Sequence, residues 1–195
     1  MQIDDYLLSQ ALLPYQDLKP TEQDGIRPAA VLLPLHQDQG EDYLLFTRRT
    51  ETLRHHKGQI SFPGGKFDLE DQQMMQTALR ENQEELGIDP GAIKLLGSLP
   101  PFTTITHYHL YPIIGRFEWP YDLNPNPAEI SEVIRVPLRH LLDPANYRLE
   151  QKHFQGQDYP IHYFDFLPHI IWGITGQILF EFFEYLLLAQ PELKV

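Results

Sequence analysis

Short apolar runs alternate with proline, glycine and charged residues along this chain, and their spacing predicts a domain built from strands and helices. A helix is expected from Asp71 to Leu86, because Gly87 supplies a helix-ending signal directly after it. A turn is expected at 38–42, a short helix at 138–142, and strands at 29–35, 43–48, 59–62, 93–99, 107–117, 130–137, 147–151 and 159–166. This mixture favours an α/β fold in which helices flank a sheet.

The two end regions differ in character. Residues 1–27 are polar apart from two apolar patches, and we expect an N-terminal extension or a short helix packed on a domain that occupies 28–190. Residues 170–189 are very apolar, but Gln177, Glu181 and Glu184 share one helical stripe. This pattern favours a buried core helix over a membrane span, with membrane-surface attachment or a homodimer interface as alternatives.

The composition excludes several classes of protein. Of the 195 residues 42% are apolar, which rules out global disorder. A formal net charge of -12 argues against nucleic acid as the main partner, and the lack of cysteine excludes disulfides and thiolate metal sites. The first residues carry neither a basic leader nor an apolar run, so we expect no secretory signal and a cytoplasmic location.

The expected helix at 71–86 has an acidic face. At 100° per residue, Glu81, Glu84 and Glu85 fall on one side, away from an apolar side formed by Met75, Ala78, Leu79 and Leu86. These carboxylates repel one another and lie near the negative end of the helix dipole, so folding alone does not favour them. Mg²⁺ prefers oxygen ligands, so a divalent cation would offset the repulsion. A solvated acidic surface is the alternative reading.

A basic run precedes this helix. Between positions 48 and 66 lie five of the chain's 15 basic residues, against one acid, Glu51. The five are Arg48, Arg49, Arg54, Lys57 and Lys66. In a protein of negative net charge this run indicates a defined anionic ligand, and the planar fork of arginine suits phosphate. The alternative is a solvated basic loop.

Two further features are interpreted as structural. His107 and His109 have strand spacing that puts both rings on one face, and we expect ordinary strand histidines there rather than a metal pair. The aromatic residues near the C-terminal end are expected to belong to the core rather than to a base-stacking platform. They are Trp172, Phe180, Phe182, Phe183 and Tyr185.

The segment from Gly65 to Ile88 resembles the Nudix box, G-x5-E-x7-R-E-U-x-E-E-x-G-U, where U is apolar. The matching residues are Arg80, Glu81, Glu84, Glu85, Gly87 and Ile88. Asn82 departs from the pattern at an apolar position. Asp71 replaces the first Glu and is followed by one extra residue. The Nudix subfamily of coenzyme A pyrophosphatases shares that extra residue and that acid.

A second motif supports the same subfamily. It has the form L-L-T-x-R-[SA]-x3-R-x3-G-x3-F-P-G-G, and the chain matches it from Leu45 to Gly65 except at Phe46 and Thr50. Together with later segments, the resemblance covers about residues 28–188. It implies a Nudix fold, with a mixed sheet sandwiched between helices. It also implies hydrolysis of coenzyme A or its derivatives to 3′,5′-ADP and 4′-phosphopantetheine.

The resemblance assigns roles to particular residues. Mg²⁺ or Mn²⁺ would be held by Glu81, Glu84 and Glu85, with Arg80 bracing the carboxylates. Either Glu84 or Glu129 would act as general base. The substrate would contact a set of basic residues and the expected glycine turn: Arg48, Arg49, Arg54, Lys57, Gly64 and Gly65. Two alternatives stay open: hydrolysis of another nucleoside diphosphate derivative such as NADH or ADP-ribose, and a non-catalytic nucleotide sensor.

Overall fold

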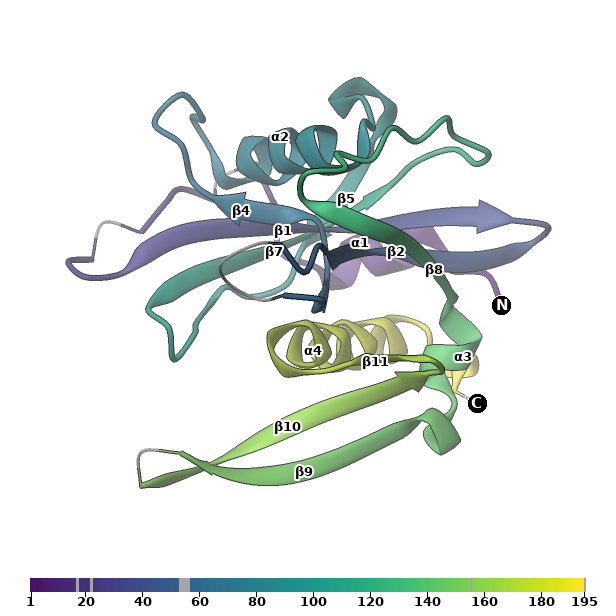
Figure 1. Ribbon diagram of the computed structural model, residues 1–195. Helices are drawn as coiled ribbons and strands as arrows, with labels where there is room; N and C mark the ends of the chain where they lie inside the picture. Colours follow the sequence, from purple (N-terminus) through teal and green to yellow (C-terminus); the bar gives the residue numbers. More distant parts are fainter. Residues whose placement is uncertain (17, 22, 53–56, 155, 195) are drawn as a thin grey trace.

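A large mixed β-sheet forms the centre of the molecule, with helices on both of its faces (Figure 1). The computed structural model describes residues 1–16, 18–21, 23–52, 57–154 and 156–194. The candidate residue Arg54 therefore lies outside the described residues. Helix α2 covers one face of the sheet, and α4 lies on the other, between the large sheet and a smaller one. The expected sandwich of helices around a mixed sheet is confirmed.

The large sheet is organised around its longest strand. Strand β1 (Arg27–Asp38) pairs in parallel with β7 (Tyr108–Arg116) and antiparallel with β2 (Glu41–Arg49). Shorter or peripheral strands complete the sheet, namely β3 (Ile60–Ser61), β4 (Gly64–Lys66), β5 (Lys94–Ser98), β6 (Phe102–Thr103) and β8 (Ile130–Pro137). Antiparallel pairing with β2 places β8 next to the basic end of that strand.

The helices and a second sheet complete the fold. The helices are α1 (Asp5–Ala11), α2 (Met74–Leu86), α3 (Leu138–Leu142) and α4 (Gly173–Ala189), with short 3₁₀ turns at Pro90–Ala92, Pro144–Asn146 and Pro191–Leu193. The second sheet contains β9 (Tyr147–Phe154), β10 (Gln157–Phe166) and β11 (His169–Ile171), all antiparallel. Figure 1 shows this sheet beyond α4, so the strands expected at 147–151 and 159–166 are separate from the central sheet.

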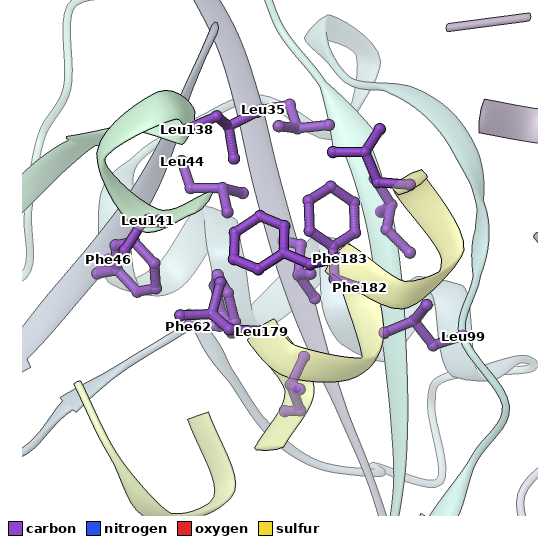
Figure 2. Packing of buried hydrophobic residues seen from close by; sticks show 14 of the residues in the cluster. Leu35, Leu44, Phe46, Phe62, Leu99, Leu138, Leu141, Leu179, Phe182 and Phe183 are labelled. Carbon is purple, nitrogen blue, oxygen red and sulfur yellow. The ribbon is translucent and has the colours of Figure 1, made fainter. Parts of the chain in front are cut away.

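Alternation along β1 and β2 fills two hydrophobic clusters. Leu33 and Phe46 point to the cluster that contains α4, whereas Leu32 and Leu45 point to the cluster under α2. Figure 2 shows the first cluster, where side chains of α4 and α3 meet those of the strands. Leu8 of α1 is buried in the same cluster. The segment before residue 28 thus contributes to the core, and the domain boundary placed there stays a prediction.

The apolar C-terminal segment forms a core helix, as expected. Phe182 and Leu186 of α4 are fully buried, and Glu184 lies on its exposed side. Within the described residues, no helix is both long enough and apolar enough to cross a bilayer. One part of the prediction is wrong, because the helix starts only at Gly173 and Trp172 is 43% exposed rather than part of the core.

Three other parts of the structure differ from the sequence expectations. Helix α2 begins at Met74 rather than Asp71, because Gln76 Oε1 accepts hydrogen bonds from the backbone N–H groups of Gln72 (2.6 Å) and Gln73 (2.9 Å). The expected turn at Gly64–Gly65 is instead strand β4, paired with β1. His107 has a φ of 61° and lies in a turn before β7, so it does not share a strand face with His109.

Candidate active site

Two glycines of β4 allow close packing, one against β1 and the other against α2. A Cβ atom at Gly64 would lie 2.7 Å from the Cα atom of Val31, and closer still to the carbonyl oxygen of Ala30 in β1. A Cβ atom at Gly65 would lie 2.5 Å from each carboxylate oxygen of Glu81. Strand β4 therefore has no side chain at the two places where the β1 backbone and a helix carboxylate must fit. Close approach, rather than turn formation, explains the glycine pair.

Arg80 is the centre of an ion-pair network at the side of α2. Its guanidinium contacts Glu81 at 2.8 Å, Asp71 at 3.0 Å and Glu84 at 3.4 Å. It also donates to the carbonyl oxygen of Lys66 at 3.1 Å. The buried Asp71 additionally accepts a hydrogen bond from Thr77 Oγ1 at 2.8 Å, and these donors lower its pKa despite its burial. Arg80 thus fixes two helix carboxylates and the turn that precedes the helix.

Glu85 is buried, which contradicts the expected outward direction of all three glutamates. Only 3% of it is exposed, and burial, the main cause, raises its pKa to about 8. Its partners are the Thr47 hydroxyl, at 3.4 Å, and the backbone of Gly64. Burial also raises the pKa of Glu81, against the lowering effect of Arg80. Glu84 remains exposed.

The buried face of α2 is rotated relative to the predicted one. Met74, Ala78, Asn82 and Glu85 follow one another at helical spacing and are all buried, whereas Met75 and Leu79 are only half-buried. The prediction used apolar residues alone to locate the face, and so it missed two polar residues that point inward. Neither side-chain atom of Asn82, Oδ1 or Nδ2, has a hydrogen-bond partner among the described residues.

Glu129 and Arg49 influence the carboxylates of α2 through their charges. The negative charge of Glu129 raises the pKa of both Glu81 and Glu85, while the positive charge of Arg49 lowers that of Glu85. The backbone links the two, because the N–H of Thr50 donates to the carbonyl oxygen of Glu129 at 2.8 Å. Arg49 Nε is buried and has no hydrogen-bond partner among the described residues. The Arg49 guanidinium can therefore donate a further hydrogen bond close to Glu85.

The basic run does not form a single patch. Arg49 acts on Glu85 of α2, whereas the neighbouring Arg48 is turned away from that carboxylate, although the pairing of β2 with β8 is irregular between the two residues. Arg48 and Lys57 line a pocket of about 470 Å³. The rest of its lining comes from Gly58, Gln59, Ile60, Pro168, His169, Ile170 and Trp172. The sequence interpretation did not mention His169 and assigned Trp172 to the core, because β11 and the start of α4 lie over a hundred positions along the chain from Arg48.

The donor chemistry near β4 suits a hard divalent cation. Glu81, Glu84 and Glu85 offer carboxylate oxygens, and repulsion among these acids contributes to the raised pKa values of Glu81 and Glu85. A cation would offset that repulsion and the cost of burying Glu85. Within the described residues, however, no group of three or more His, Asp or Glu side chains is already gathered closely enough to hold a metal ion. Glu81, Glu84 and Glu85 therefore have ligand atoms that suit a divalent cation, but their side chains are not arranged around a common point.

Comparison with known proteins places these features in a family. The family model described as "NUDIX domain" matches residues 25–156. An "Uncharacterized Nudix hydrolase NudL" from Photorhabdus laumondii is 37% identical over 158 residues, covering 81% of this chain and 84% of the relative. "Nudix hydrolase 15, mitochondrial" from Arabidopsis thaliana is 36% identical over 167 residues, covering 81% of this chain and 59% of that protein.

A solved structure is similar in fold. The crystal structure of a MutT/nudix family protein from Enterococcus faecalis superposes with a TM-score of 0.52 at 14% sequence identity. The match covers 89% of this chain and 70% of that one. At this identity the likeness concerns the arrangement of helices and strands alone.

Proposed function

Because the chain belongs to the NUDIX domain family and is a Nudix hydrolase, we propose that it cleaves the pyrophosphate bond of coenzyme A or its thioesters. The products would be 3′,5′-ADP and 4′-phosphopantetheine or its acyl derivative. The observation that carries the proposal is that Glu85 is influenced by the charges of Glu81 and Glu129 and by the opposite charge of Arg49. A pyrophosphate needs both a donor for its oxygens and carboxylates that can work with a cation, and the two kinds of group meet here.

Three glutamates of α2 would hold the Mg²⁺ or Mn²⁺ ion, namely Glu81, Glu84 and Glu85. When bound, such an ion offsets charge on the pyrophosphate and lowers the pKa of a bound water. Arg80 supports this role because its ion pairs fix the directions of Glu81 and Glu84. Gly65 supports it as well, because the absence of a side chain there leaves room for the Glu81 carboxylate.

In the proposed reaction, water attacks one phosphorus in line with the bond that breaks, and the other phosphate leaves. Arg49 would bind the pyrophosphate oxygens through its unpaired Nε, which limits the motion of the substrate. The attacking water must lose a proton, and we assign its acceptance to Glu129. The charge of Glu129 acts on both Glu81 and Glu85, whereas Glu84, the other candidate, is engaged by Arg80 at 3.4 Å.

The choice of coenzyme A as the substrate rests on two basic residues away from the proposed pyrophosphate site, Arg48 and Lys57. They line the pocket beside Trp172, whereas Arg49 acts on Glu85, so the protein offers basic side chains beyond those that the pyrophosphate needs. Coenzyme A carries a 3′-phosphate in addition to its pyrophosphate. Both basic residues lie in the segment that resembles the motif of the coenzyme A pyrophosphatase subfamily, at positions that the motif leaves open. Arg54 belongs to the same motif and stays a prediction.

A substrate panel tests the proposal. Coenzyme A, acetyl-coenzyme A, dephospho-coenzyme A, NADH and ADP-ribose would each be incubated with the protein and Mg²⁺ or Mn²⁺, and the products separated by chromatography. We expect release of 3′,5′-ADP from both coenzyme A substrates, with a higher kcat/KM than for the other three. Faster cleavage of NADH or ADP-ribose would replace coenzyme A as the substrate. Binding without turnover of any compound would indicate a nucleotide sensor.

A further inference from the structure

The pocket lined by Arg48 and Trp172 has the composition of an anion site with an aromatic wall. It lies beside β11 and the start of α4, which are on the opposite side of the large sheet from α2 (Figure 1). Its described lining contains two cationic side chains, Arg48 and Lys57, and no carboxylate, although the protein has a net charge of -12. Such a local excess of positive charge favours an anionic ligand.

The aromatic wall is held in place from behind. The indole ring of Trp172 stacks on the buried ring of Tyr163, with 6.0 Å between centroids and an angle of 11° between planes. The guanidinium carbon of Arg148 lies 3.8 Å from the Tyr163 centroid and packs against that supporting ring. Trp172 itself remains 43% exposed. A large, exposed ring with a fixed orientation is well suited to stack against a flat ligand.

Arg48 makes only weak ion pairs and can bind another anionic group. Arg48 is 3.8 Å from Glu51 and 3.7 Å from Glu132, and both distances exceed the usual limit of about 3.2 Å for a hydrogen bond. These loose, exposed pairs stabilise little. The walls of the pocket are joined more firmly, because Thr175 Oγ1 of α4 donates to the carbonyl oxygen of Ile60 in β3 at 3.1 Å. The pocket is therefore a defined site with a cation that is weakly engaged.

We infer that this pocket binds the adenine base and the 3′-phosphate of the substrate, with the base stacked on Trp172 and the phosphate held by Arg48 and Lys57. The inference rests on the proposed function, and it names the end of coenzyme A that the pocket takes. One ribose carries both the 3′-phosphate and the 5′-diphosphate. Arg48 and Arg49 are consecutive at the end of β2; Arg48 lines the pocket and Arg49 acts on Glu85, so a ligand that passes around the end of this strand can contact both.

Calorimetric binding of the product fragments tests this site, because it requires no turnover. The ligands are adenosine 3′,5′-bisphosphate, adenosine 5′-monophosphate and 4′-phosphopantetheine, each in buffer with Mg²⁺. We expect Trp172→Ala to weaken binding of both adenosine nucleotides by about tenfold to a hundredfold, and Trp172→Phe to retain most of the affinity. Arg48→Ala should weaken binding of the bisphosphate about tenfold or more and leave the monophosphate nearly unchanged.

Matched controls separate this site from the overall function. Tyr6 is 70% exposed on α1, so Tyr6→Ala removes an exposed ring elsewhere and should bind all ligands like wild type. Wild-type affinity of Trp172→Ala for the bisphosphate, or a loss confined to 4′-phosphopantetheine, would overturn the inference. If the pocket variants behave as expected but coenzyme A is not cleaved, the proposed reaction fails and the binding site stands. If the protein cleaves coenzyme A but the pocket variants bind the nucleotides like wild type, the proposed reaction stands and the assignment of the adenine site to this pocket is excluded.

Discussion

Gly65 lies against Glu81 so closely that a Cβ atom added to Gly65 would stand 2.5 Å from both oxygens of the Glu81 carboxylate. The carboxylate is the mobile end of a side chain, so it can move away without disturbing the backbone. We therefore expect Gly65→Ala to lower kcat/KM by about a hundredfold, through displacement of a proposed metal ligand, while the melting temperature changes little. Steady-state kinetics and thermal denaturation of the same preparation would measure both.

The neighbouring glycine provides the matched comparison. A Cβ atom at Gly64 would meet the backbone of Ala30 and Val31, which cannot move without disturbing β1. Gly64→Ala should therefore cost about 1–3 kcal/mol of folding free energy and lower the melting temperature by several degrees. If Gly65→Ala were as destabilising as Gly64→Ala and fully active per folded molecule, close packing against Glu81 would have no role in catalysis.

The buried carboxyl group of Glu85 predicts a pH dependence of stability. Burial raises its pKa from an ordinary 4.5 to about 8, so between these values the folded state holds a proton that the unfolded state releases. The free energy of unfolding should consequently fall as pH rises from 5 to 8 in metal-free buffer with a chelator. Urea denaturation would measure this slope, which should be clearly shallower in Glu85→Gln. Equal slopes in the two proteins would show that Glu85 is ionised throughout this range.

Divalent cations should stabilise the protein by binding to the folded state. Burial, together with repulsion from other acids, raises the pKa of Glu81 and Glu85, and Mg²⁺ or Mn²⁺ would offset both effects, so the melting temperature should rise with metal concentration. This gain should shrink in a Glu81→Gln, Glu85→Gln double variant. A Glu118→Gln, Glu192→Gln variant has the same change in charge at exposed positions and should keep the full gain. An undiminished gain in the first variant would place the ion elsewhere.

Asn82 predicts a stabilising substitution. It is fully buried, and neither polar atom of its side chain has a hydrogen-bond partner among the described residues. Leucine has a similar shape and suits the apolar position that the Nudix box specifies here. Asn82→Leu should raise the free energy of unfolding by about 1–3 kcal/mol, because it removes the cost of burying an unpaired amide. Chemical denaturation checks this, and a loss of stability would show that the amide is satisfied in the native protein.

How far the sequence predicts the structure depends on whether a feature is local. The end of α2 at Gly87 was predicted correctly, because a left-handed residue with a φ of 73° favours glycine in any context. The burial of Glu85 was not predictable from periodicity, since its partners, the Thr47 hydroxyl of β2 and the backbone of Gly64 in β4, come from strands that lie well before it in the chain. Trp172 was misassigned for a related reason, because an apolar run alone does not reveal where a helix starts.

The separation of Arg48 from Arg49 is the feature of the site with the sharpest consequence for specificity. A linear run of cations suggested one anion site, but Arg49 acts on Glu85 whereas Arg48 lines the pocket beside Trp172. The two arginines should therefore serve different phosphates of the same substrate, with Arg49 at the pyrophosphate that is cleaved. Kinetics on coenzyme A and dephospho-coenzyme A distinguish these roles, because only coenzyme A has the 3′-phosphate.

We expect Arg49→Ala to lower kcat/KM on both substrates by a similar factor, because both contain the scissile pyrophosphate. Arg48→Ala should lower kcat/KM for coenzyme A by about tenfold to a hundredfold, the value of one charge-assisted contact of roughly 1.5–3 kcal/mol, and should affect dephospho-coenzyme A much less. The two variants remove the same charge from adjacent positions, so each serves as the control for the other. If both variants lost activity equally on both substrates, the 3′-phosphate would not be bound by Arg48, and the assignment of coenzyme A would depend on the motif alone.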